Sequence, residues 1–310
     1  MSTVKYCLNR ILMLLLVVSC SQNMEQEPMK ETNGKDEIPP ISVEQEVLDM
    51  LDDLSLNTTH VGIEKVPSIY GGNQKGYVVE KDIFLLKTEI QDMHKAHLAL
   101  KDKKQSVLGR HYRSRFLVAL GANGKKNLKV FAFKNLVTAD GQLGLSKRER
   151  RALRSAVNRY NGLNRLDISF TVKFSNEVED FQEADIWVFN DPLKPEDVIG
   201  ANARFPKRNG KPGEFVKIFN LNGLSFGRLE AVLTHELGHT IGLQHTDYYT
   251  LESCEGRDVN IADSNPLNGV AIEETPVETD SKSIMLSCLD PNRTTGKLSR
   301  FDKRALRALY

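Results

Sequence analysis

The stretch HELGHTIGLQH, residues 235–245, holds three histidines and one glutamate at spacings that suit a metal site. On a helix, His235 and His239 project from one face about one turn apart, where their ring nitrogens can bind a single zinc ion. Glu236 lies beside them and can reach a water on the ion without being a ligand. Gly242 fits a left-handed helix end, after which the chain can turn and bring His245 back as a third ligand. Three protein ligands leave a fourth position for water, so the stretch predicts one catalytic Zn²⁺ ion with Glu236 as general base.

The helix that carries this motif must also pack against the rest of the protein. It is expected to begin near Ser225, and its apolar side chains offer a face for a sheet: Leu229, Val232, Leu233 and Leu237. Gly238 would let another element approach the helix closely. The alternative is an ordinary amphipathic helix with structural histidines, but five residue types at fixed spacing favour the metal site.

Periodicity and turn signals place the motif helix within an α+β fold. We expect helices over 41–56, 86–101, 146–161 and after residue 299, a strand or helix lead-in over 77–85, and strands over 114–120, 128–137, 166–174, 184–190, 200–205 and 214–220. Two of the helices begin with a capping box, Ser146 with Glu149 and Ser299 with Asp302. From residue 126 onward this order predicts one sheet backed by two helices.

The first residues are typical of a processing signal rather than of a fold. Lys5 and Arg10 lead into an apolar run over 11–18 that is too short to span a bilayer. The run ends at VVSC, which resembles a bacterial lipobox in which Cys20 carries lipid; a plain secretory signal is the alternative. We therefore divide the chain into a lipoprotein signal peptide (1–19), a disordered tether (20–40), an N-terminal region (41–125) and a catalytic domain (126–310).

The net charge and the number of cysteines bear on the kind of binding partner and on whether the protein is exported to an oxidising compartment. The formal net charge is +1 over 310 residues, so nothing indicates a nucleic-acid partner. Cys7 would leave with the signal and Cys20 would carry lipid, which leaves Cys254 and Cys288. In an exported protein such a pair favours a disulfide, with two buried free thiols as the alternative.

The long pattern HExxHxxGxxH is similar to the zinc signature of the metzincin metallopeptidases. Their second mark, a tight turn with a methionine beneath the metal, resembles Ser283-Ile284-Met285. Within this clan the chain is most similar to the bacterial dual-action HEIGH-type metallopeptidases, with HELGH in place of HEIGH and a cysteine soon after the methionine. The resemblance implies a metzincin-like catalytic domain, with a twisted, mostly parallel sheet and an edge strand, two long helices, the Met-turn and a C-terminal helix, after a smaller N-terminal region.

The resemblance also implies peptide-bond hydrolysis. The stretch before the active-site helix is similar to the metzincin edge strand that lines the cleft, which would hold an extended protein or peptide substrate by strand addition: Ala201, Asn202, Ala203, Arg204 and Phe205. Some metzincins have a tyrosine two residues after the turn methionine, but Ser287 stands there, so that role is not carried over. Asp247 could orient His245 or form a loop salt bridge.

The region 41–125 is either a propeptide or a permanent subdomain. Latent metzincins often cover the zinc with an upstream cysteine or aspartate, and no cysteine follows Cys20 in this region. Asp82 and Asp92 are conceivable covers, although solvated carboxylates are the favoured interpretation.

These features predict an exported zinc endopeptidase in the bacterial cell envelope, anchored to the membrane by lipid at Cys20 or released from it. The alternative is a catalytically inactive, surface-binding lipoprotein that uses the same scaffold with a structural zinc ion. The intact Glu236 favours the enzyme, because a structural site gains nothing from that residue.

Overall fold

The computed structural model describes residues 42–67, 73–99, 111–195, 197–248, 251–254, 270–275, 280–290 and 292–310. The expected signal peptide, Cys20 and the tether lie outside these residues. All described residues belong to one unit, 41–310. None of the helices in this described part is both long and apolar enough to cross a membrane.

Residues 126–310, which we call the catalytic part, contain five neighbouring strands in the order β10-β11-β9-β5-β8. Their bounds are β5 Lys126–Phe133, β8 Ile168–Ser175, β9 Ile186–Asn190, β10 Gly200–Ala203 and β11 Phe215–Phe219. Within this group β11, β9, β5 and β8 run parallel, and β10 runs antiparallel to β11. Side chains alternate along β5, so that Leu128 and Val130 join one core while Phe131 and Phe133 join the core on the opposite face.

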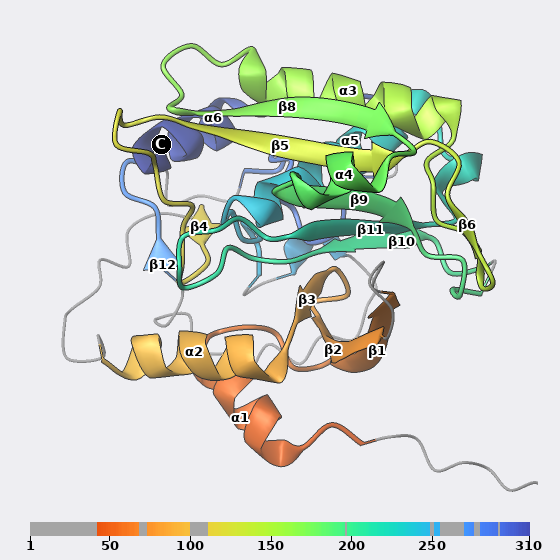
Figure 1. The fold of residues 1–310 in the computed structure, drawn as a ribbon. Coiled ribbons are helices and arrows are strands. Elements are labelled where there is room, and N and C mark those ends of the chain that lie inside the picture. Colours follow the sequence, from red (N-terminus) through yellow and green to blue (C-terminus); the bar gives the residue numbers. More distant parts are fainter. Residues whose placement is uncertain are drawn as a thin grey trace, which may run out of the picture. The chain divides into compact units, whose positions relative to one another are not determined.

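Helices cover the face of the sheet to which Leu128 and Val130 point. They are α3 (Lys147–Asn161), α5 (Phe226–Thr240) and α6 (Arg300–Leu309), and α3 runs along β8 in Figure 1. At the start of α3, Ser146 accepts from the Glu149 N–H and the Glu149 carboxylate accepts from the Ser146 N–H at 2.7 Å. The two long helices α3 and α5 contact each other, and the Tyr160 hydroxyl donates to the Thr234 carbonyl at 2.6 Å. The motif helix α5 is thereby fixed between α3 and the sheet.

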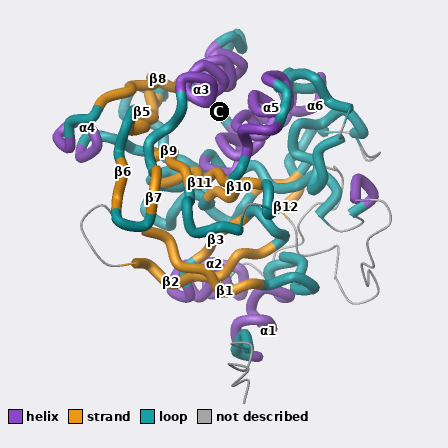
Figure 2. The backbone as a smooth tube through the Cα atoms, turned by 90° about the vertical axis from the view of Figure 1, so that its right-hand side faces the viewer, coloured by secondary structure: helices purple, strands orange, loops and turns teal. Residues whose placement is uncertain are grey.

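The N-terminal region extends the same sheet. Its elements are α1 (Gln45–Asp53), β1 (Gly62–Pro67), β2 (Asn73–Val79), β3 (Ile83–Leu85) and α2 (Lys87–Leu98). Strands β1 to β3 form an antiparallel meander, and β3 pairs in parallel with β10 through Ile83 and Ala203. The result is one sheet of eight strands in the order β1-β2-β3-β10-β11-β9-β5-β8, and Figure 2 shows β3 beside β10. Helices α1 and α2 pack on a core of their own that includes Val47, Leu51 and Ile90.

Short elements connect these layers. They are β4 (Tyr112–Arg113) paired with β12 (Val270–Ala271), β6 (Val137–Thr138) paired with β7 (Gly141–Gln142), α4 (Val178–Gln182), and 3-10 turns over Leu221–Gly223 and Glu252–Cys254. The expected strand over 114–120 is wrong. That segment is a loop because its N–H groups donate to other loops, as from Ser114 to the Gly242 carbonyl and from Ala119 to the Gly210 carbonyl. It packs with both parts of the chain, because Val118 joins the core beneath the helices α3 and α5 while Phe116 packs against the core of the N-terminal region.

The α+β prediction is confirmed, including the mostly parallel sheet, the two long helices and the C-terminal helix. The predicted edge strand requires a correction. Ala201, Asn202 and Ala203 lie in β10, whereas Arg204 and Phe205 lie just beyond its end. β10 has neighbours on both sides among the described strands, because β3 occupies the side that was expected to be free.

Candidate metal centre

The three histidines come from the end of α5 and from the bend that follows it. His235 and His239 lie inside α5, which ends one residue after His239. The Gly242 N–H then donates to the His239 carbonyl at 2.9 Å, and Gly242 has a φ of +98°. An L side chain is strained at this φ, so glycine lets the chain turn sharply and bring His245 back toward the other two histidines.

The Nε2 atoms of the three imidazoles meet in one small space. The Nε2 atom of His235 lies 2.9 Å from that of His239 and 3.2 Å from that of His245. Each Nδ1 atom faces an acceptor on the outside, namely the Ile284 carbonyl at 2.7 Å from His235, the Leu243 carbonyl at 2.8 Å from His239, and the Glu80 carboxylate at 2.6 Å from His245. These acceptors place the ring proton on Nδ1, which leaves a lone pair on each Nε2.

This donor set fits a metal cation. Three lone pairs at such short separations repel one another unless a cation lies between them, and three imidazoles are a common set for a catalytic metal. Burial lowers the pKa of His239 to about 4, which keeps the ring neutral, as a metal ligand must be. The acceptors on Nδ1 orient the rings in the way that metal-binding histidines require. His235, His239 and His245 would therefore hold the ion.

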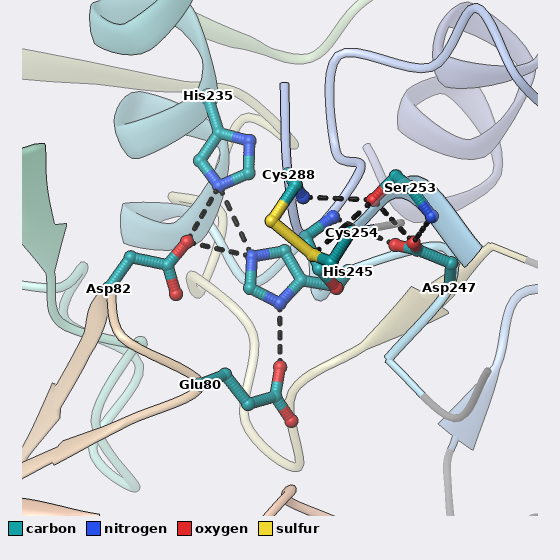
Figure 3. The surroundings of a disulfide bond; sticks show 9 residues. Glu80, Asp82, His235, His245, Asp247, Ser253, Cys254 and Cys288 are labelled. Atoms are coloured by element: carbon teal, nitrogen blue, oxygen red, sulfur yellow. Dashed lines mark hydrogen bonds and ion pairs between the residues drawn. A yellow bond between two sulfur atoms is a disulfide. The ribbon is translucent and has the colours of Figure 1, made fainter. Parts of the chain in front are cut away.

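The N-terminal region supplies a fourth candidate ligand, Asp82. Its Oδ2 atom lies 3.2 Å from His235 Nε2, 2.9 Å from His245 Nε2 and 3.9 Å from His239 Nε2, and the four residues form one group that could bind a metal. Figure 3 shows this carboxylate between the His235 and His245 rings. Burial raises the pKa of Asp82, but the imidazoles outweigh burial and hold it well below its usual value, so the group is an anion. The expectation of a solvated carboxylate is wrong for Asp82, whereas Asp92 is half exposed.

The turn between β2 and β3 delivers Asp82 to the histidines. Glu80 and Lys81 both have positive φ, 53° and 76°, a conformation that is uncommon for residues other than glycine. The Ala203 N–H donates to the Asp82 carbonyl at 2.8 Å, which ties the turn to β10. Positive φ at two consecutive residues suits a type I′ turn between antiparallel strands, and the contacts of Glu80 with His245 and of the Asp82 carbonyl with Ala203 hold this turn against the catalytic part.

The carboxylate that orients His245 is Glu80, and not Asp247. Burial lowers the pKa of His245, but Asp82 and Glu80 outweigh burial and raise it well above its usual value. The same two carboxylates would favour a metal cation on Nε2 in place of a ring proton. Asp247 instead accepts from the Ser287 N–H at 2.8 Å and from the Ser253 N–H and hydroxyl at 2.9 and 2.5 Å. Among the described residues, Asp247 therefore makes neither of the contacts that the sequence offered for it, and its oxygens accept from two loop segments instead.

Cys254 and Cys288 form a disulfide bond close to these loops, with Cα atoms 5.2 Å apart. Ser253 stands beside it, accepts from the Cys288 N–H at 2.9 Å and donates its hydroxyl to Asp247. Figure 3 shows the disulfide, Ser253 and Asp247 next to His245. The bond fastens the loop after His245 to the segment that follows the Met-turn.

Glu236 is buried and only 3% exposed, and its Oε2 atom has no hydrogen-bond partner among the described residues. Burial raises the pKa of Glu236 well above its usual value, and the negative charge of Asp82 raises it further. A buried carboxyl group with a raised pKa and an unpartnered oxygen is suited to accept and return a proton.

Ser283, Ile284 and Met285 form the turn that packs against α5. Met285 is fully buried, and a Cβ atom added at Gly238 would lie only 2.6 Å from its Sδ atom, so Gly238 does permit the close approach. Asp302 of α6 holds this turn by accepting from the Ser283 hydroxyl at 2.6 Å and from the Ile284 N–H at 2.9 Å. Because the Ile284 carbonyl accepts from His235, α6 is linked to a candidate metal ligand through one residue. The sequence marked Asp302 only as a helix cap.

A second group that could hold a metal consists of His111, Asp280 and Asp302. Its carboxylates already accept from protein donors. Asp302 accepts from the N–H groups of Ile284 and Ser299, and Asp280 accepts from the Ser299 hydroxyl. This group is therefore best described as a hydrogen-bond network that joins the start of α6 to the Met-turn.

The fold and the histidine site define a metallopeptidase. Residues 110–310 match the family described as dual-action HEIGH metallo-peptidase, so the chain belongs to this family and the predicted relationship is confirmed. The matched range leaves out α1, α2 and the β1–β3 meander. A search of curated proteins gave no match. Two solved structures are similar to the chain at 14% sequence identity, and each match covers 62% of it. The match to "Structure of Myroilysin" covers 82% of that chain with a TM-score of 0.36, and the match to "Crystal structure of myroilysin" covers 88% of that chain with a TM-score of 0.33.

Proposed function

We propose that this chain is an exported zinc endopeptidase in which Glu236 acts as the general base. The observation that carries the proposal is the convergence of three imidazole Nε2 atoms, each with its Nδ1 atom tied to an acceptor, beside the buried carboxyl group of Glu236. The rival role, a surface-binding protein with a structural metal, has no use for a buried carboxyl group with an unpartnered oxygen.

The roles of the residues follow from this arrangement. When bound, zinc lowers the pKa of a water from about 15.7 to about 7 and polarises a peptide carbonyl. Glu236 accepts the proton of the attacking water and passes it to the departing amine. His235, His239 and His245 hold the ion, while the Ile284, Leu243 and Glu80 acceptors fix their rings. Substrate access requires a free fourth position, so the Asp82 carboxylate must leave the histidines before hydrolysis.

We further propose that the N-terminal region is an inhibitory propeptide rather than a permanent subdomain. Its Asp82 carboxylate lies among the three histidines, and its strand β3 pairs with the strand that was expected to bind substrate. The family match begins at residue 110, after α1, the β1–β3 meander and α2 of this region. A permanent subdomain in this position would leave neither the fourth metal position nor the outer side of β10 open to a substrate.

Asp82→Asn tests this function in the full chain, and Asp92→Asn is the matched control from the same region. With one equivalent of zinc loaded, we expect Asp82→Asn to release zinc to a chelator at least about tenfold faster than Asp92→Asn, because one candidate ligand is lost. The same variant should hydrolyse unfolded casein faster than the wild type. Equal zinc release by the two variants would remove Asp82 from the metal centre, and casein left intact by every preparation would refute the peptidase.

Export and anchoring rest on the N-terminal sequence, outside the described residues. We propose that Cys20 carries lipid and holds the mature protein in the bacterial cell envelope. Cys20→Ser should move the protein from the membrane fraction to the soluble fraction, and unchanged membrane association would contradict lipidation.

A further inference from the structure

We infer that the substrates of this site are peptides with acidic side chains close to the scissile bond, and that Arg204 selects them. This inference rests on the proposed function and names its substrate class. It derives from the charges on the two sides of the contact between the N-terminal region and the catalytic part.

The ion pairs across this contact share one polarity. Among pairs whose two partners both lie in the described residues, the acid belongs to the N-terminal region and the basic group to the catalytic part. Apart from the contacts to the histidines of the metal centre, they are Glu64 with Lys194 and Lys217, Glu89 with Arg204, and Asp92 with Arg208. The catalytic side therefore presents a basic surface to whatever lies along β10.

Arg204 is the cation best placed to read a substrate. It directly follows Ala203, the β10 residue that pairs with Ile83, and Ile83 is the neighbour of Asp82. Its side chain is 1% exposed, lies over the Phe215 ring with the guanidinium carbon 5.6 Å from the ring centre, and forms ion pairs with Glu89. A cavity of about 630 Å³ opens beside it between the N-terminal and catalytic residues. An extended chain in the place of β3 would thus carry side chains past this guanidinium.

Lys217, on the neighbouring strand β11, is likewise a buried cation that pairs with an acid of the N-terminal region. It is completely buried, and its Nζ atom lies 2.5 Å from Glu64 of the N-terminal region and 3.0 Å from Asp191 of the catalytic part. Departure of the N-terminal region removes Glu64 and leaves Asp191. Arg204 likewise loses Glu89 and keeps Glu214, which also pairs with Lys207.

Once the N-terminal region has left, the acids that remain in these ion pairs are Asp191 and Glu214. They are fewer than the basic side chains that they must pair with, which are Lys194, Arg204, Lys207, Arg208 and Lys217. A basic group at a partly desolvated site gains most from an anionic partner with which it can form charge-assisted hydrogen bonds. A peptide glutamate or aspartate that reaches Arg204 would take the place of Glu89, whereas an uncharged side chain of the same shape would not. Acidic residues in the substrate would therefore be preferred over their amides.

Peptide binding to a cut form of the full chain tests this inference without requiring hydrolysis. A site-specific cleavage sequence is inserted between Ala99 and His111 of the Glu236→Gln chain, the chain is cut, and both fragments are kept in solution. Labelled peptides of one common sequence, with glutamate or glutamine at one position at a time, then compete with the N-terminal fragment. At one position or more, the glutamate peptide should bind at least about tenfold more tightly than its glutamine counterpart, and higher salt should reduce this ratio.

Arg204→Gln should reduce the preference to less than about twofold, while Arg151→Gln, an exposed position on α3, should retain it. If Arg204→Gln does not fold, Lys207→Gln at a partly exposed position replaces it and should also lower the ratio. Equal binding of glutamate and glutamine peptides at every position, or a preference that survives these substitutions, would overturn the inference. Failure of both the zinc-loaded Asp82→Asn chain and the cut chain with Glu236 intact to cleave casein would refute the proposed function separately, because the binding assay uses a hydrolysis-deficient chain.

Discussion

Gly238→Ala should weaken zinc binding more than it weakens the fold. The added Cβ atom would lie 2.6 Å from Met285 Sδ and 3.1 Å from the Tyr160 hydroxyl oxygen. Packed carbon and sulfur atoms are normally about 3.5–4 Å apart, so the Met285 side chain must move by about 1 Å and push on the buried turn that carries it. Such overpacking costs about 1–3 kcal/mol, and replacing a helical glycine by alanine returns about 1 kcal/mol. The free energy of unfolding of the metal-free chain should therefore fall by only about 0–2 kcal/mol.

Zinc affinity should fall further because the displaced turn carries the Ile284 carbonyl, which accepts from His235 Nδ1 at 2.7 Å. Loss of such a supporting contact typically reduces metal affinity about 10–100-fold. The dissociation constant is measured by competition with a chromophoric chelator, and stability by equilibrium denaturation. Gly223→Ala is the matched control, because a Cβ atom there meets nothing within 4 Å. Wild-type zinc affinity in Gly238→Ala would refute the link between the Met-turn and the metal centre.

Three further predictions concern the surroundings of the site. Replacing Cys254 and Cys288 by serine should lower the free energy of unfolding by about 3–4 kcal/mol, since the bond closes a loop of 34 residues; an unchanged denaturation midpoint would contradict this. Burial raises the pKa of Glu230, but Arg159 and further hydrogen-bond donors outweigh burial, so the pKa in the folded chain is lower than usual. The ionised Glu230 therefore stabilises the fold fully above the pKa of the unfolded chain, about 4.3, and this stabilisation is lost as the pH falls through the folded pKa. Glu230→Gln should accordingly be less stable than the wild type at pH 7, with the gap in thermal midpoint closing below about pH 4, and a gap independent of pH would argue against an ionised Glu230. Asp302→Asn should lower stability by about 3–5 kcal/mol, because a buried charged acceptor is lost, and wild-type stability in denaturant would contradict its role in holding the Met-turn.

The metal ligands could be predicted because their chemistry is local in the sequence. His235 and His239 are one helical turn apart, and Gly242 marks the left-handed residue that returns His245. The capping boxes at Ser146 and Ser299 likewise fix helix starts through contacts within four residues. Such signals depend only on short-range geometry, so they can be recognised in the sequence without knowledge of the fold.

The sequence could name Asp82 and Asp92 as conceivable covers of the metal but could not choose Asp82, because the choice depends on contacts between distant segments. Asp82 lies 153 positions before His235, and its turn uses positive φ at Glu80 and Lys81, two residue types that do not signal this conformation. The pairing of β3 with β10 involves a single residue pair, Ile83 with Ala203, which leaves no periodic trace. The short EKD segment between two apolar strands was the available hint of a turn, and it did not indicate where that turn would dock.

The central claim, that Glu236 transfers the proton in a zinc-dependent hydrolysis, is tested most directly by one comparison. The Asp82→Asn chain and the Asp82→Asn, Glu236→Gln chain are each loaded with zinc, their metal content is measured, and their rates of casein hydrolysis are compared. We expect both chains to bind one equivalent of zinc, and the chain that lacks Glu236 to hydrolyse casein at least about 100-fold more slowly. Equal rates at equal zinc content would contradict the assignment of Glu236 as the general base.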